Sequence, residues 1–153
     1  MRLLIGSDHA GYALKEHLKT VMAAWGHQVD DAGCYGEEPV DYPDIAEKVV
    51  LGIKGGQADL GLLVCGTGQG MAMVANKVPG IRAAVCNDEF SARAAREHND
   101  ANVLTLGARV VGSGVAASIV KGFLESTYAG GRHQRRLDLI KAIESKYLKQ
   151  GEK

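Results

Sequence analysis

The sequence predicts an α/β fold in which helices cover both faces of a five-stranded parallel sheet, a three-layer doubly wound arrangement of the Rossmann or flavodoxin-like kind. Short apolar runs alternate with longer segments of helical spacing along nearly all of the 153 residues. Uninterrupted apolar runs are typical of parallel strands that are buried on both faces. No long polar or Pro/Ser-rich stretch divides the chain, so we expect a single domain over 1–153.

Each expected strand is a short apolar run that is followed by a longer helical segment. The strands are expected at 3–6, 28–31, 59–64, 81–86 and 102–106. The helices are expected at 10–25, 43–54, 69–77, 89–98 and 115–128. In the first helix Leu14, Leu18 and Met22 recur at a spacing that places apolar side chains on one face. Strand and helix therefore alternate throughout, as in a sheet built from βαβ units.

Two five-strand arrangements are common for this architecture, half of a Rossmann fold and the flavodoxin-like order 2-1-3-4-5. In the second, the first and third strands are neighbours, and the connections that leave them go to opposite faces of the sheet. This opens a crevice at the carboxyl ends of both strands, where ligands bind. Asp8 and His9 follow the first strand, and Cys65 follows the third. We therefore expect these two turns to meet across the crevice.

The segment 132–149 has a further helical pattern, in which Leu137, Ile140 and Ile143 are apolar. It follows two consecutive glycines, and no strand comes after it. We expect such a terminal helix to reach a partner subunit. Packing on its own sheet is the alternative.

A cysteine and three alternating glycines follow the third strand. The run is Cys65, Gly66, Thr67, Gly68, Gln69 and Gly70. Closely spaced glycines let several backbone N–H groups point at one place, and the N-terminus of the next helix adds partial positive charge. The sequence therefore predicts an anion-binding loop, and the same field favours thiolate over thiol at Cys65.

Other phosphate-binding motifs fit this loop poorly. A P-loop needs a Lys and a hydroxyl residue after its last glycine, and a cysteine phosphatase loop needs an Arg where Met71 stands. The dinucleotide fingerprint is missed by one residue, although Asp88, after the next strand, stands roughly where a ribose-binding acid would. A nucleotide-binding module stays open as a hypothesis, as does a loop whose glycines serve only a tight turn.

Two further segments, Asp8–His9 and His98–Asn99, contain candidate site residues. Asp8 either takes part in function or serves only as the N-cap of the next helix, whereas His9 is a donor suited to a phosphate or a sugar hydroxyl. His98 and Asn99 end the fourth helix, which we expect near the same edge of the sheet. The alternative there is a histidine that complements the helix dipole, with Asn99 as a left-handed cap.

Arg132 and Arg136 lie four residues apart, so that they share a helical face. Two guanidinium groups on one face suit a dianionic phosphate. The alternative is an ordinary solvated surface, because Asp138 and Lys141 follow closely and offer routine ion pairing.

Composition and hydropathy indicate which partners, location and cofactors to expect. Lys plus Arg and Asp plus Glu number 18 each, so global charge gives no argument for a nucleic-acid partner. The first apolar run is too short for a signal peptide, and no apolar span reaches membrane length, so we expect a cytoplasmic protein with no membrane association. Cys34, Cys65 and Cys86 lack the spacing of a disulfide framework or a zinc site, and we expect no metal and no cofactor.

Six short motifs, taken together, resemble the type B ribose-5-phosphate isomerases. The motifs are GSDHAG at 6–11, DYPD at 41–44, CGTGQG at 65–70, EHND at 97–100, LGAR at 106–109 and GGRHQRR at 130–136. This family also includes allose-6-phosphate and galactose-6-phosphate isomerases. The match is colinear over nearly the whole chain, and the set of motifs is specific.

The resemblance implies reversible aldose–ketose isomerisation of ribose 5-phosphate and ribulose 5-phosphate through an enediolate, a step of the pentose phosphate pathway. By this similarity Cys65 is the base that moves the proton between C2 and C1. His98 is the residue that opens the furanose ring, assisted by Thr67. The substrate-binding residues implied in the same way are Asp8, His9, Gly66, Thr67, Gly68, Gln69, Gly70, Asn99, Arg109, Arg132 and Arg136.

The resemblance also implies a homodimer, or a dimer of dimers, with active sites at subunit interfaces. The implied chemistry agrees with the residues, because an enediolate needs a base and donors for a developing oxyanion, and Cys65 and the adjoining amides supply both. A 6-phosphohexose isomerase is the alternative, since pocket depth and not the reacting groups separates five carbons from six. A nucleotide-binding regulatory module is a further alternative.

Overall fold

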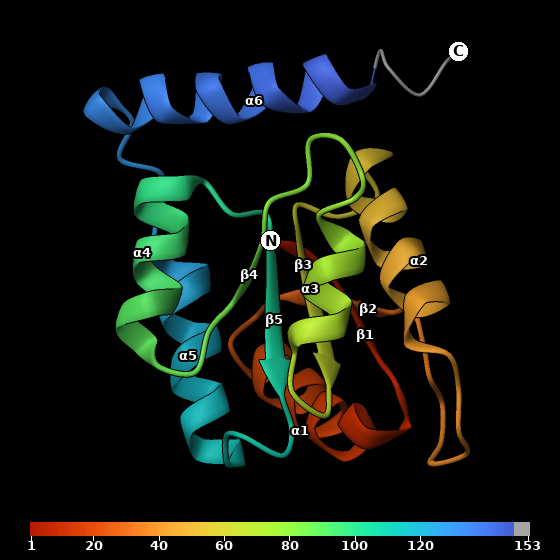
Figure 1. The fold of residues 1–153 in the computed structure, drawn as a ribbon. Helices are drawn as coiled ribbons and strands as arrows, with labels where there is room; N and C mark the ends of the chain where they lie inside the picture. Colours follow the sequence, from red (N-terminus) through yellow and green to blue (C-terminus); the bar gives the residue numbers. More distant parts are fainter. Residues whose placement is uncertain (149–153) are drawn as a thin grey trace.

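The computed structural model describes residues 1–148, and its centre is a five-stranded, all-parallel sheet (Figure 1). The strands are β1 (Arg2–Ser7), β2 (Gln28–Asp31), β3 (Leu60–Cys65), β4 (Ala83–Val85) and β5 (Val103–Gly107). Apart from the first residue of β1, the strands β1, β3 and β5 are buried throughout. The parallel sheet expected from the sequence is therefore confirmed.

Helices cover both faces of this sheet. The helices are α1 (Tyr12–Ala24), α2 (Tyr42–Lys54), α3 (Gln69–Ala75), α4 (Glu89–Asn99), α5 (Ser113–Glu125) and α6 (Gln134–Leu148), with short 3₁₀ turns η1 (His9–Gly11) and η2 (Gly131–His133) before α1 and α6. α1, α4 and α5 pack on one face, and α2 and α3 pack on the other. None of these helices is both long and apolar enough to cross a membrane. The doubly wound α/β fold with an extra C-terminal helix is confirmed, and position 149 of the expected helix lies outside the described residues.

The strand order is β2-β1-β3-β5-β4, which matches the flavodoxin-like order in its first three strands and exchanges the last two. β1 and β3 are neighbours, as expected, with Ser7 opposite Val64. β5 lies inside the sheet, between β3 and β4, and all of its residues are buried, as is typical of an inner parallel strand. β4 forms the edge and has only three residues, all of them half-buried.

Each face of the sheet has its own apolar core, because successive side chains of a strand point to opposite faces. Leu62 and Val64 of β3 pack with residues of α1, α4 and α5. Leu63 and Cys65 of the same strand pack with residues of α2 and α3. Cys65 therefore stands where this second core meets the loop that follows β3.

The strands begin at one edge of the sheet, here called the amino edge, and end at the other, the carboxyl edge. α6 lies across the amino edge, and the turns after β1, β3 and β5 lie at the carboxyl edge (Figure 1). Within its described bounds α6 has no buried residue, and its Leu139, Ile143 and Tyr147 are 56%, 59% and 60% exposed. The helix does contact the body of the chain, for example where the Gly80 N–H donates to Glu144 Oε1 at 3.0 Å.

Candidate active site

Cys65 is the last residue of β3 and is 5% exposed. Its Sγ accepts a hydrogen bond from the Gly68 N–H at 3.1 Å. Gly68 makes this contact with a φ of +79°, in the left-handed region that glycine adopts without steric cost. A backbone N–H donated to sulfur stabilises negative charge on it. The loop therefore holds the Cys65 sulfur in a place where it can act as a base or a nucleophile.

The loop between Cys65 and α3 lies directly on the end of β5. A Cβ atom added to Gly107 would lie 2.8 Å from the Thr67 Cα, so a side chain there would displace the loop. The N–H of Gln69 donates to Thr67 Oγ1 at 3.4 Å, whereas the N–H groups of Gly66 and Thr67 find no acceptor among residues 1–148. Two free donors beside a thiol can bind a negatively charged oxygen.

The turn after β1 lies beside this loop, as the sequence predicts. The Asp8 N–H donates to the Val64 carbonyl at 3.1 Å. Asp8 is 7% exposed, and its Oδ1 accepts from the Gly11 N–H at 2.9 Å, so the N-cap role considered from the sequence is present. His9 Nδ1 accepts from the Val40 N–H at 3.5 Å. An acid, an imidazole and the thiol therefore meet at the carboxyl edge.

Arg109 and Tyr42 also border the glycine loop. The Arg109 N–H donates to the Gly66 carbonyl at 3.0 Å, and the guanidinium lies over Gly66, 3.6 Å from an added Cβ. The Tyr42 ring lies so close to Gly70 that an added Cβ would approach it to 2.8 Å. Arg109 is among the residues expected from the sequence. Tyr42 is not, although the DYPD motif at 41–44 is the signal that points to it.

His98 and Asn99 lie at the amino edge, so the expectation that they lie near the same edge as Cys65 is wrong within one chain. α4 starts at the carboxyl edge after β4 and runs antiparallel to the strands (Figure 1). The Asn99 carbonyl accepts from Arg82 Nε at 2.9 Å, directly before β4 begins. The length of β5, which rises about 3.3 Å per residue, separates this end from Cys65. One chain therefore does not bring the two groups together.

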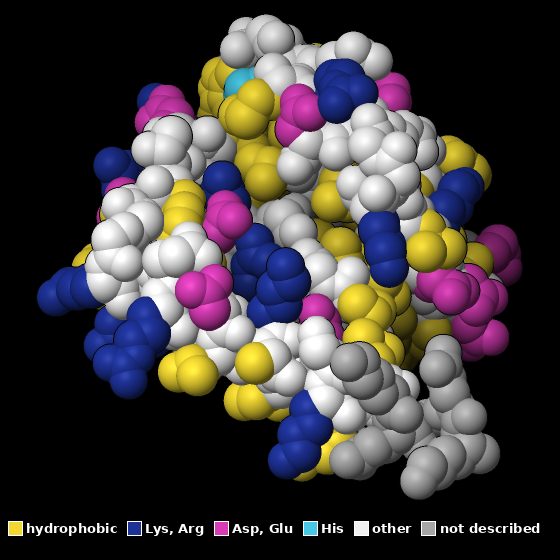
Figure 2. Space-filling model, turned by 90° about the horizontal axis from the view of Figure 1, so that it is seen from above, with side chains coloured by type: hydrophobic (Ala, Val, Ile, Leu, Met, Phe, Trp, Pro, Cys, Tyr) yellow, Lys and Arg dark blue, Asp and Glu magenta, His cyan; other side chains and the backbone are white. Residues whose placement is uncertain are grey.

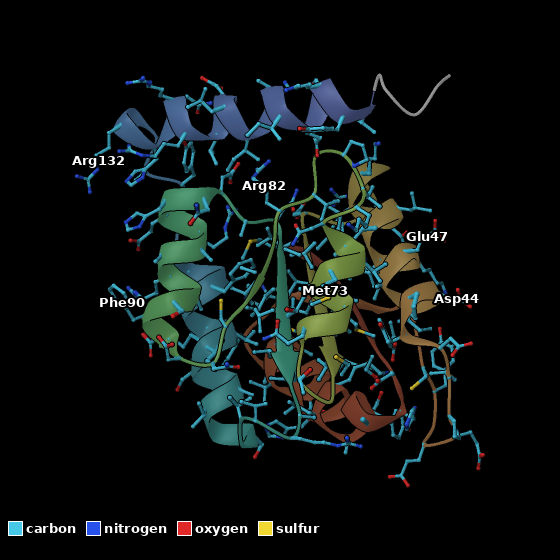
Figure 3. All side chains as sticks on the ribbon, viewed as in Figure 1. Asp44, Glu47, Met73, Arg82, Phe90 and Arg132 are labelled. Carbon is cyan, nitrogen blue, oxygen red and sulfur yellow. The ribbon has the colours of Figure 1, made fainter. Side chains whose placement is uncertain are left out.

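At the amino edge His98 joins the basic segment that leads into α6. Its ring stacks on that of His133, with centroids 4.4 Å apart and an interplanar angle of 9°. Desolvation, and then electrostatic interactions with His98, Arg132 and Arg136, lower the pKa of His133 below its ordinary value. Figure 3 shows Arg132 at this end of the molecule. The predicted His98 and arginines do lie together, but at the edge opposite to Cys65.

The two predicted arginines are both exposed, Arg132 in the 3₁₀ turn η2 and Arg136 in the first turn of α6. Arg136 Nη1 donates to the Arg132 carbonyl at 2.7 Å. Together with Arg135 and Leu139 they line an open hollow. Figure 2, which looks down on the amino edge, shows Lys and Arg side chains together with hydrophobic ones at this end. The hollow is therefore basic with an apolar border, which suits a phosphate group.

Two other carboxylates have structural partners. Asp100, and not Asn99, takes the left-handed conformation that ends α4, with a φ of 44°, and it pairs with Arg82 at 2.7 Å. Asp88 caps the start of α4, accepting from the Ser91 N–H at 2.7 Å. Since β4 lies two strands away from β3, Asp88 does not lie beside the glycine loop as a ribose-binding acid would.

This arrangement has counterparts among known proteins. A family model described as Ribose/Galactose Isomerase matches residues 3–140. Ribose-5-phosphate isomerase B of Escherichia coli (strain K12) is 45% identical over 145 residues, which cover 95% of this chain and 97% of that protein. The chain belongs to the ribose/galactose isomerase family.

Solved structures of ribose/galactose isomerases share the fold over nearly the full length. Ribose-5-phosphate isomerase B of Clostridium thermocellum matches with a TM-score of 0.95 at 50% identity, covering 96% of this chain and 99% of that one. Ribose-5-phosphate isomerase B of Mycoplasma genitalium with bound ribulose-5-phosphate has a TM-score of 0.89 at 42% identity, covering 94% and 96%. The family resemblance found in the sequence is therefore confirmed.

In this ribose/galactose isomerase the residues expected from the sequence divide into two sets. The set at the carboxyl edge is Asp8, His9, Cys65, Gly66, Thr67, Gly68, Gln69, Gly70 and Arg109. The set at the amino edge is His98, Asn99, Arg132 and Arg136. Tyr42 and His133 adjoin these two sets and were not expected, although both lie within the motifs that carry the resemblance.

Proposed function

We propose that this protein interconverts ribose 5-phosphate and ribulose 5-phosphate through an enediolate. The observation that carries the proposal is the Cys65 thiol at the end of β3, which accepts the Gly68 N–H and lies beside two amides that have no acceptor among residues 1–148. Two relatives support the same reaction, because the Escherichia coli protein is named for it and the Mycoplasma genitalium structure contains ribulose-5-phosphate.

In the proposed reaction the Cys65 thiolate removes the proton from C2 of the open-chain aldose, and negative charge passes to the oxygen on C1. The N–H groups of Gly66 and Thr67 bind that oxygen, in the manner of an oxyanion hole. The hydroxyl proton passes from the C2 oxygen to the C1 oxygen, and the sulfur returns the carbon-bound proton to C1. General base catalysis of this kind raises the reaction rate by about 10²- to 10⁴-fold.

Ring opening and phosphate binding are proposed to depend mainly on the amino-edge set, together with residues of the carboxyl-edge set. His98 takes the proton from the C1 hydroxyl and supplies one to the ring oxygen, since imidazole gains and loses protons near neutral pH. Thr67 assists. Arg132, Arg136 and His9 bind the phosphate. The residues proposed to bind the sugar hydroxyls are Asp8, Asn99, Arg109 and the loop 66–70.

These two sets lie at opposite edges of one chain, so the proposed reaction requires two copies. We propose a homodimer, or a dimer of dimers, in which the amino edge of one copy completes the carboxyl edge of its partner. Two-fold symmetry makes two equal sites from one such contact. The exposed Leu139 and Ile143 of α6 support this assembly, because they offer an apolar surface to a second copy.

Turnover of the purified protein tests the proposed reaction. Ribose 5-phosphate is supplied, the formation of ribulose 5-phosphate is followed with a coupling enzyme, and Cys65→Ala serves as the inactive control. We expect turnover by the wild-type protein and a rate about 10³-fold lower in the variant. Absence of turnover by well-folded wild-type protein would overturn the proposal.

A 6-phosphohexose isomerase is the second candidate, because the matching family model names galactose as well as ribose. The same base and amides would serve allose or galactose 6-phosphate. The ratio of kcat/KM values for ribose 5-phosphate and allose 6-phosphate decides between them, and we expect it to favour the pentose by more than about tenfold.

Mixing two inactive variants tests the proposed assembly. Cys65→Ala and His98→Asn are produced together, so that half of the dimers contain one chain of each kind. Each mixed dimer then has one site with both changes and one intact site, and the preparation should regain about a quarter of the wild-type activity. If both groups of a site came from one chain, every site would carry a change, and no activity would return.

A further inference from the structure

Lys15 of α1 carries the most deeply buried charge among residues 1–148. The residue is 0% exposed, and no step of the proposed reaction uses it. A buried ammonium is costly unless it is paired and hydrogen-bonded. The partners of Lys15 therefore indicate what its burial achieves.

The Lys15 ammonium lies at the centre of a small polar cluster. Its Nζ donates to Asp31 Oδ2 at 2.5 Å and to Glu16 Oε1 at 2.6 Å. The rings of Tyr12 and Tyr35 lie 5.4 Å and 5.8 Å from the same nitrogen, within the range of a cation–π contact. Asp31 ends β2, so the ammonium binds the point at which the chain leaves the sheet.

Asp31 in turn holds the backbone that follows it. Its Oδ1 accepts from the Gly33 N–H at 2.9 Å, and its carbonyl accepts from the Tyr35 hydroxyl at 3.0 Å. The Gly33 carbonyl accepts from the Ser7 N–H at 2.6 Å, and the Cys34 N–H donates to the Ser7 carbonyl at 2.7 Å. The turn after β2 is therefore attached to the last residue of β1.

From this turn the segment 32–42 runs along the carboxyl-edge site. Ser7 directly precedes the Asp8–His9 turn. The Val40 N–H lies 3.5 Å from His9 Nδ1, and the Tyr42 ring packs against Gly70. The segment therefore borders both the turn after β1 and the loop after β3.

We propose that Lys15 is a positioning residue, which acts through Asp31 to hold the segment 32–42 against His9 and the glycine loop and thereby sets the affinity for substrate. The identity of that substrate rests on the proposed function. Lys15 touches none of the reacting atoms in the proposed reaction, so its removal should weaken binding and leave the chemical step nearly unchanged.

Lys15→Met tests this role, because methionine fills a similar volume without the charge. Asp31 keeps a second cation in this variant, since Lys19 Nζ also donates to its Oδ2. The matched control is Lys19→Met, which removes that second cation from the same helix but lies partly exposed. We expect Lys15→Met to raise KM for ribose 5-phosphate about fivefold or more and to change kcat less than about twofold, while the control changes neither.

A lower kcat with an unchanged KM in Lys15→Met would overturn the proposal. A purely structural Lys15 would reduce only the amount of folded enzyme, which lowers kcat per total protein and leaves KM unchanged. If Lys15→Met fails to fold, Asp31→Asn takes its place, because it keeps the side-chain oxygen that accepts from Gly33 but lacks the charge. The same rise in KM is expected, and an unchanged KM would refute the role.

Hydrogen–deuterium exchange provides a second test that needs no activity. The amides of Ser7 and Cys34 should exchange faster in Lys15→Met than in Lys19→Met, while the amides of β5 stay as in the wild type. Unchanged exchange in the segment 32–42 would refute the positioning role. Faster exchange in a protein that turns over no sugar phosphate would support the role and refute the proposed function instead.

Discussion

The carboxyl edge and the amino edge carry comparable sets of polar side chains, but they hold them differently. Cys65 and Asp8 are 5% and 7% exposed, and both are hydrogen-bonded to the backbone of the loops around them. Arg132 of η2 and Arg136 of α6 are exposed, and neither of these elements has a buried residue. The proposed base Cys65 must aim at a reacting atom and is fixed by the packing of the sheet, whereas the arginines proposed to bind the phosphate act by charge and need less exact placement.

The largest effect is expected from Cys65→Ala, which removes the proposed base from the carboxyl edge. We expect kcat to fall by about 10³-fold, within the range of general base catalysis. Cys86→Ala is a matched control, because Cys86 is a buried thiol outside the site and should leave kcat within about twofold of the wild type. Circular dichroism checks that both variants fold, and a Cys65→Ala enzyme with near-normal kcat would contradict the role of the carboxyl edge.

A smaller effect is expected at the amino edge, where Arg132→Ala removes one of the proposed phosphate ligands. The loss of a charge-assisted hydrogen bond should raise KM for ribose 5-phosphate about tenfold, with a smaller change in kcat. Raising the salt concentration should increase KM of the wild type more than that of the variant. Arg93→Ala, which removes an exposed arginine of α4, is the control, and equal KM values for the two variants would contradict phosphate binding at Arg132.

A third prediction concerns acid stability at the carboxyl edge, where Asp31 anchors the segment beside His9. Burial raises the pKa of Asp31, but hydrogen bonds from Lys15, Lys19 and the Gly33 N–H outweigh it and hold the pKa below its ordinary value. A lowered pKa in the folded state means stabilisation that is present above the ordinary value of 3.8 and lost as the pH falls through the lowered one.

The urea midpoint of Asp31→Asn should therefore lie below that of the wild type at pH 7, and the gap should narrow as the pH falls below about 4. Asp59→Asn is the control, because Asp59 pairs with Arg2 at the surface and should shift the midpoint less. A gap that stays constant with pH would exclude the charge of Asp31 as its cause.

The smallest effect is expected in the chemical reactivity of Cys86. Burial, and then the nearby charge of Asp88, raise its pKa to about 11, so it stays protonated at pH 8. Iodoacetamide at that pH should inactivate the protein through Cys65 and leave Cys86 unmodified. Mass spectrometry of the alkylated peptides measures both sites, and modification of Cys86 at the same rate as Cys65 would contradict the expected contrast.

Much of this architecture follows from local patterns. The alternation of apolar runs and helical segments predicts the parallel sheet, and the glycines after Cys65 predict a loop of free amides. The position of His98 at the amino edge also follows from the topology, because a helix between parallel strands starts at the carboxyl edge and must end at the amino edge. The exchange of β4 and β5 does not follow from the sequence, because both runs are apolar and they differ only in their burial within the folded sheet.

The sequence also does not predict the polar cluster around Lys15 that holds the segment 32–42. A lysine between Leu14 and Leu18 follows the ordinary pattern of an amphipathic helix, whose polar residues face water. Only the three-dimensional arrangement brings Asp31 and Tyr35 over Lys15 and removes it from solvent.

The separation of the two edges has a genetic consequence. In the proposed dimer, a chain that lacks both Cys65 and His98 disables both sites of every mixed dimer that it enters. Produced in equal amounts with the wild type, it would leave only the dimers of two normal chains active, about a quarter of the total. Such an allele would be dominant negative, whereas the same double change in an enzyme with self-contained sites would halve the activity at most.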